Sequence, residues 1–167
     1  GADRARSEGY GATVVAALTS GSEATRATSV GQIYSRASLD DPGRAILVDQ
    51  MARLHNDLGP LQHHHSELIE TRMGTKVSYV LHVYARATGA TSWKDFQFRL
   101  DPEPPNKLDR LVFIADVAEP VYLPNGDITD AATLAWLNGY VDKLVAENDL
   151  SGSVLLAKGD TPFFERL

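Results

Sequence analysis

Three consecutive histidines, His63, His64 and His65, and the nearby Glu67 are the residues best suited to metal binding in this sequence. On a β-strand, alternate side chains share a face, so His63, His65 and Glu67 would form one row and His64 would point to the other side. Two imidazoles and a carboxylate suit zinc and related metals. The alternative is a polar edge strand with solvated histidines. The sequence leaves both possibilities open and makes His63 and His65 the candidate metal ligands.

A second candidate for chemistry is His82, which lies in a segment with a clear alternating pattern. There it shares a face with Tyr84, and Tyr79 is on the opposite face. Together with an acid such as Asp95 or Asp116, this pair could transfer protons in an apolar pocket. The alternative is an ordinary sheet histidine, since one titratable side chain does not make a site.

The aromatic residues Trp93, Phe96 and Phe98 form either an apolar wall for a ligand or part of the hydrophobic core. Aromatic side chains dominate cores as well as binding sites, so their type does not decide between the two. A candidate ligand pocket combines the histidine with nearby aromatic residues. Its members are Tyr79, His82, Tyr84, Phe96 and Phe98.

The elements that must position these side chains begin with helices in the first third of the chain. Apolar residues recur at helical spacing in residues 9–19 and 22–37, and again from residue 46 to residue 58. Residues 38–42 resemble a helix entry, with acids in the first turn and a proline near the start. The pair Gly59 and Pro60 predicts the end of the third helix.

After Pro60 the pattern changes to the alternation of β-strands. Strands are predicted over residues 61–69, 77–86, 95–100 and 108–117, and the proline-rich residues 101–106 form a loop. The apolar residues 111–114 predict that the last strand is central or buried on both faces. The fold class that follows is α+β, with helices packed on a curved antiparallel sheet.

The remaining residues predict a linker and a small second part. Residues 118–128 contain two prolines and an Asn-Gly pair, which is typical of a linker. A helix capped by Thr129 or Asp130 follows, and then a β-hairpin with its turn at residues 158–161. Trp136 and Tyr140 lie four residues apart on this helix, so they share a face that we expect to contact another domain.

Composition excludes several functional classes. The 167 residues include 16 Lys+Arg and 22 Asp+Glu, which gives a net charge of −6 without a basic cluster, and this disfavours nucleic-acid binding. The absence of cysteine excludes disulfides, thiol catalysis and Cys-ligated metals. No apolar run approaches the roughly 20 residues of a membrane span. We expect no cofactor.

Residues 129–167 resemble the opening of the serine β-lactamase-related hydrolases, which include class C-like enzymes, esterases and penicillin-binding proteins. That family has a helix followed by a strand of the form (F/L)-S-G-x-V-L-(V/L)-A-(R/K)-(D/G)-G. Here residues 150–160 are LSGSVLLAKGD, and PFFE follows at residues 162–165. The family's nucleophile belongs to a Ser-x-x-Lys motif. None of the five lysines has a serine three residues before it, so we expect this chain to be inactive by itself.

Residues 1–117 are similar in element order to cystatin-like and NTF2-like domains, in which helices pack into a cone-shaped sheet. The two resemblances predict a cystatin/NTF2-like domain over residues 1–117, a linker over 118–128 and the truncated start of a hydrolase domain over 129–167.

The two resemblances predict that the chain is a non-catalytic N-terminal accessory domain, which packs on or gates the catalytic domain of the same polypeptide. A second copy of the chain, in a homodimer, is the other partner that the sequence allows. We expect a periplasmic or secreted protein after signal-peptide removal, because the start Gly1-Ala2 lacks an initiator Met; otherwise it is cytoplasmic. The alternative is a free-standing NTF2-like domain that binds a small molecule or acts as an isomerase.

Overall fold

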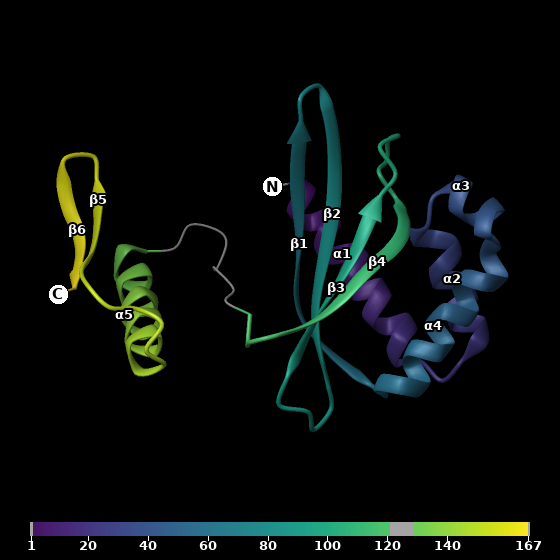
Figure 1. Ribbon diagram of the computed structural model, residues 1–167, viewed down its shortest axis with the longest axis horizontal. Helices are drawn as coiled ribbons and strands as arrows, with labels where there is room; N and C mark the ends of the chain where they lie inside the picture. Colours follow the sequence, from purple (N-terminus) through teal and green to yellow (C-terminus); the bar gives the residue numbers. More distant parts are fainter. Residues whose placement is uncertain (1, 121–128, 167) are drawn as a thin grey trace. The chain divides into compact units, whose positions relative to one another are not determined.

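The computed structural model describes residues 2–120 and 129–166, with side chains from residue 6 onward. The chain divides into two compact units, Gly1–Tyr122 and Leu123–Leu167. Their boundary falls in the predicted linker 118–128, of which residues 121–128 lie outside the described part. The first unit contains helices and a four-stranded sheet, and the second contains a helix and a hairpin (Figure 1). The predicted α+β class is confirmed.

The helical part of the first unit follows the predicted order. Its elements are α1 (Ala2–Thr19), α2 (Glu23–Ile33), α3 (Arg36–Ser38), a π-helical turn η1 (Leu39–Gly43) and α4 (Arg44–Leu58). The Ser22 side chain caps α2 by accepting a hydrogen bond from the backbone N–H of Thr25. Gly59 ends α4 with a φ of 71°, a conformation that favours glycine. None of the described helices is long and apolar enough to cross a membrane.

The four predicted strands form one antiparallel sheet in the order β1-β2-β3-β4. They are β1 (Leu61–Met73), β2 (Lys76–Ala87), β3 (Trp93–Leu100) and β4 (Leu108–Val117). The prediction that the last strand is central or buried on both faces is wrong, because β4 is an edge strand. Its Val112 and Phe113 are 59% and 58% exposed. A register shift opposite Gln97 and Phe98 also leaves Val112 without a partner residue on β3.

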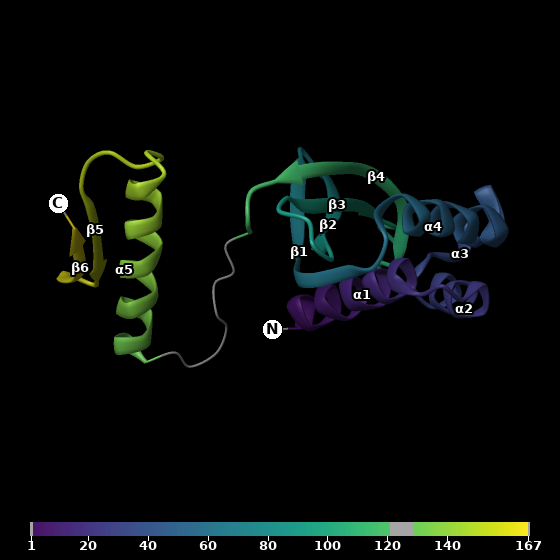
Figure 2. The ribbon, with the colours of Figure 1, turned by 90° about the horizontal axis from the view of Figure 1, so that it is seen from below.

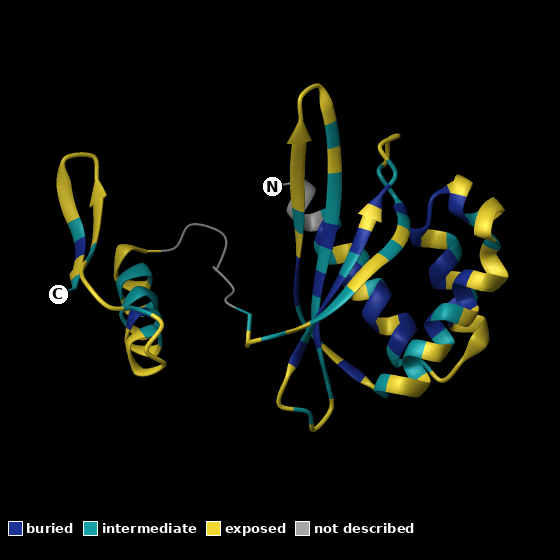
Figure 3. Ribbon diagram, in the orientation of Figure 1, coloured by how far each residue is buried: buried dark blue, intermediate teal, exposed yellow. Residues whose placement is uncertain are grey.

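The hydrophobic core lies between the helices and one face of this sheet. Leu81, Val83 and Ala85 of β2 alternate with polar residues and pack with Phe96 and Phe98 of β3. From the helices, the core takes side chains of α1, α2 and α4, which lie together beside the curved sheet (Figure 2). The outer part of the β1–β2 hairpin is largely exposed (Figure 3).

Helix α1 covers the open edge of β1. Ser66 donates its backbone N–H to a Glu8 carboxylate oxygen at 3.3 Å, and its carbonyl accepts a hydrogen bond from the Ser7 hydroxyl at 3.4 Å. At the other end of α1, the Thr19 hydroxyl bonds both the N–H and the carbonyl of Leu61. These contacts satisfy backbone groups that an edge strand would otherwise leave unpaired, and they fix β1 against the helix.

The second unit consists of α5 (Asp130–Ala146) and the hairpin of β5 (Val154–Lys158) and β6 (Thr161–Arg166). Of the two predicted caps, Thr129 and Asp130, the structure has Thr129, whose hydroxyl accepts a hydrogen bond from the backbone N–H of Ala132. Among the described residues of this unit, the buried apolar side chains are Val141 and Phe164. A helix and two strands with so small a core have little stability of their own.

Candidate functional site

A block of polar and aromatic side chains occupies the sheet face opposite the core. Antiparallel register places them in two rows across β1, β2 and β3. The first row is His65, Tyr84 and Asp95, and the second is Glu67, His82 and Gln97. All six alternate with core residues, so they share one face, which we call the polar face.

The best-defined interaction on the polar face joins His82 to Asp95. His82 Nδ1 lies 2.9 Å from Asp95 Oδ2 and 3.1 Å from Oδ1, and Gln97 donates its side-chain N–H to Oδ2 at 2.8 Å. The Asp95 side chain is only 7% exposed and that of His82 is 15% exposed. A carboxylate so buried requires hydrogen-bond donors, and His82 and Gln97 supply them.

This arrangement fixes the role of the His82 ring. When Nδ1–H donates to Asp95, the neutral imidazole carries its free electron pair on Nε2. Among the described residues Nε2 has no hydrogen-bond partner, and it is not one of the buried unpaired atoms. It therefore reaches solvent, where in the neutral ring it can accept a hydrogen bond. A histidine oriented by a carboxylate in this way is suited to acid–base chemistry.

Tyr84 lies between the two histidines of the polar face. Its ring stacks on His65 with centroids 4.8 Å apart and on His82 with centroids 6.2 Å apart. Burial, together with the negative charges of Asp95 and Glu67, raises the pKa of Tyr84 to about 12. The hydroxyl therefore stays protonated at neutral pH and can donate a hydrogen bond.

A second imidazole–carboxylate pair lies on the β1 side of Tyr84. His65 Nε2 is 3.1 Å from Glu67 Oε1, and His65 is almost fully buried. His64 Nδ1 lies 2.7 Å from His65 Nδ1, so one ring donates and the other accepts. His64 also contacts the edge of Trp93, which carries the Arg86 guanidinium 4.5 Å above its ring centre.

The prediction that His63 and His65 share a face is wrong. The register of β1 shifts between them, since His63 pairs with Ala85 and His65 with Tyr84, which are neighbours on β2. His63 consequently faces α1, where its Nε2 lies 2.9 Å from the Ser66 hydroxyl and 4.0 Å from a Glu8 oxygen. Burial lowers the pKa of His63. A β-bulge of this kind inserts one residue and reverses the alternation after it.

The register shift in β1 therefore puts His63 and His65, the two proposed metal ligands, on opposite faces of the sheet. Among the side chains of residues 6–120 and 129–166, no group of three or more His, Cys, Asp or Glu is arranged to hold a metal ion.

The predicted ligand pocket is divided between the two faces of the sheet. His82 and Tyr84 lie on the polar face, whereas Phe96 and Phe98 are fully buried in the core and Tyr79 packs against it. Of the two acids proposed for His82, Asp95 is its partner. Asp116 instead pairs with Lys94, with the Lys94 Nζ atom 2.7 Å from its carboxylate.

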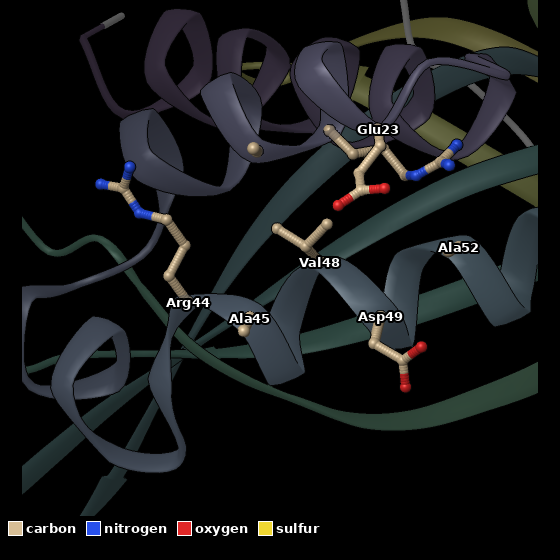
Figure 4. Close-up of a pocket in the computed structure, with 8 residues that line it drawn as sticks. Glu23, Arg44, Ala45, Val48, Asp49 and Ala52 are labelled. Atoms are coloured by element: carbon tan, nitrogen blue, oxygen red, sulfur yellow. The ribbon is translucent and has the colours of Figure 1, made fainter.

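A cavity elsewhere in the first unit contains none of the predicted residues. It is a groove of about 460 Å³ between α2 and α4, with Val48 and small alanines along it. Figure 4 shows the Glu23 carboxylate over Val48 and the Arg44 side chain at one end. Asp49, which also lines it, is paired with Arg53 at 2.8 Å.

In the second unit, Trp136 and Tyr140 share a face of α5 as predicted. Their rings stack with centroids 5.1 Å apart, and both side chains are half-buried. Lys158 of the hairpin reaches Asp130 at 3.1 Å, and Arg166 donates to Asn138 at 2.8 Å. These contacts hold the hairpin on α5 and leave Leu155 60% exposed.

Comparisons with protein-family models, with curated proteins and with solved structures find no match for this chain.

The residues that sequence reasoning missed are Gln97 and the helix residues Ser7 and Glu8. Alternation placed Gln97 on the same strand face as Asp95, which was a usable signal. The contacts of Ser7 and Glu8 with β1 depend on how α1 packs, and no sequence pattern indicated them.

Proposed function

We propose that this chain is the N-terminal accessory module of an exported serine hydrolase of the β-lactamase-related family, joined to the first elements of the hydrolase domain. In this proposal, residues 1–117 pack on the catalytic domain or control access to its cleft. The observation that carries it is the helix and hairpin of the second unit, where the LSGSVLLAKGD segment leads into and forms β5.

The exposure of the second unit supports this proposal. Leu155 and Leu156 of β5 and Val145 of α5 are exposed, although they belong to an apolar strand and helix. Exposed apolar side chains on a unit with only a small core indicate a missing partner surface. Further strands of a hydrolase domain would pair with the hairpin and bury these residues.

The first test is the reading frame that encodes the chain. The proposal requires a Ser-x-x-Lys motif in residues that follow Leu167 in the full polypeptide. That polypeptide should hydrolyse nitrocefin or p-nitrophenyl acetate, and replacing the motif serine by alanine should abolish the activity. A frame without the motif, or activity that survives loss of the serine, would refute the proposal.

A substitution at Leu155 provides a structural test of the same proposal. Leu155→Asn should leave the stability of the 167-residue chain nearly unchanged, because the side chain is already exposed. In the full polypeptide it should destabilise the hydrolase domain by about 2 kcal/mol or more, as expected for a polar group placed in a core. Equal, small effects in both proteins would show that the hairpin is not covered.

The geometry of His82 and Asp95 favours a second candidate function, a domain that binds a small molecule or acts as an isomerase. A carboxylate-oriented imidazole beside a neutral phenol provides one proton acceptor and one donor on the same face. The test is a fragment screen by ¹H–¹⁵N NMR. Ligands should shift the resonances of His82 and Tyr84, whereas a library that perturbs neither residue would exclude this function.

A further inference from the structure

Three groups on the polar face have hydrogen-bonding capacity that the described protein does not use. They are the Nε2 atom of His82, the hydroxyl of Tyr84 and the side-chain carbonyl oxygen of Gln97. Each has no hydrogen-bond partner among the described residues and none is a buried unpaired atom, so all three reach solvent. His82 and Gln97 each use one atom to bind Asp95, which holds both side chains in place.

The types of these groups restrict the ligand. The Gln97 oxygen accepts hydrogen bonds, His82 Nε2 accepts one in the neutral ring, and the Tyr84 hydroxyl can donate one as well as accept one. An anion only accepts, so it would leave both acceptors unmatched and would lie near the Asp95 and Glu67 carboxylates. An ammonium group only donates, so it would leave the Tyr84 donor unmatched. Hydroxyl groups donate and accept, and they fit the whole set.

An apolar surface adjoins these groups on β4. Phe113 is the register partner of Gln97, so its ring lies on the polar face, and it is 58% exposed. An exposed aromatic ring next to a few fixed polar groups is a common composition of small-molecule sites. The ring can pack against the C–H groups of a sugar while the hydroxyls reach Gln97, His82 and Tyr84.

We propose that the polar face binds a neutral, polyhydroxylated ligand of the oligosaccharide class, with Phe113 under the sugar ring and with His82, Tyr84 and Gln97 bonded to its hydroxyls. This proposal rests on the second candidate function and names the ligand class for it.

The test is an NMR titration of the ¹⁵N-labelled chain with two neutral probes, maltotriose and triacetylchitotriose, in the millimolar range. At least one should give saturable shifts at residues 82, 84, 97 and 113. Tyr84→Phe keeps the stacked ring and removes the hydroxyl, so it should weaken the Kd about fivefold, the factor for one neutral hydrogen bond. Tyr79→Phe is the matched control, on the same strand but the opposite face, and should leave the Kd unchanged.

A second variant does not depend on the buried pair. Phe113→Ser alters an exposed side chain, should leave the fold intact by circular dichroism, and should abolish saturable binding. The ligand class is refuted if neither neutral probe shifts these residues, if Y84F and Y79F behave alike, or if only trigalacturonate or spermidine binds there. In those cases fragment binding at His82 would still support the second candidate function, whereas its absence would remove both.

Discussion

The packing of α1 on β1 predicts that a Gly→Ala substitution at one position of α1 lowers the stability, although alanine favours helices more than glycine does. Gly11 lies in the middle of α1, and a Cβ atom added there would be 1.7 Å from the Ser66 Oγ atom and 2.7 Å from its Cβ. Gly9, one half-turn earlier in the same helix, has no atom within 4 Å of an added Cβ. Gly9→Ala and Gly11→Ala are therefore a matched pair that differ only in what the methyl group meets.

The magnitudes follow from these contacts. Gly9→Ala should stabilise the first unit by about 0.5–1 kcal/mol, the ordinary difference in helix propensity. Gly11→Ala gains the same amount but overpacks the interface, which costs about 1–3 kcal/mol. It also displaces the Ser66 hydroxyl from His63, a contact worth about 1 kcal/mol. The net expectation is a loss of about 2 kcal/mol, or about 8 °C in Tm.

The assay is urea unfolding at pH 7.5 in a Trp136→Phe background, so that the fluorescence of Trp93 reports on the first unit. The double variant Gly11→Ala with Ser66→Gly removes both clashing atoms and should recover most of the loss relative to Ser66→Gly alone. If Gly11→Ala stabilises the unit as much as Gly9→Ala does, the close approach of α1 to β1 is refuted.

Three further predictions concern the site and the sheet. Burial lowers the pKa values of His63 and His64, so on acidification the unfolded chain binds protons before the folded chain does. The free energy of unfolding should therefore fall as the pH drops below about 6.5. His63→Gln should flatten this pH dependence, measured by urea unfolding between pH 7.5 and 5.5. Asp95→Ala should cost about 3 kcal/mol by the same assay, because it leaves His82 and Gln97 without their acceptor in a largely buried position; a loss below 1 kcal/mol would contradict the pairing. Phe96→Ala should cost about 3–5 kcal/mol and Phe113→Ala less than about 1 kcal/mol, and equal losses would show that β4 is covered.

Much of the secondary structure was predictable because local patterns decide it. Helix α4 ended where Gly59-Pro60 predicted, and α5 began next to its predicted cap at Thr129. The strands followed the alternation of apolar and polar residues. The pairing of His82 with an acid was foreseen, but the choice between Asp95 and Asp116 was not. Both acids lie one strand or more away, so only the register of β2 against β3 selects Asp95.

The errors came from features that no local pattern encodes. A bulge at His64 reversed the alternation and separated His63 from His65. The same segment bonds α1 through Ser66, and that contact depends on how the helix packs. The apolar run of β4 predicted a central strand, but strand order in a sheet depends on which neighbours are available.

The sequence by itself determined the element types and the α+β class, since these depend on residue type and on spacing within a few positions. The tertiary structure decided which side chains meet. His82, Tyr84, Asp95 and Gln97 share one face because β2 and β3 pair in one register. A shift of one residue would have turned the side chains of either strand to the other side.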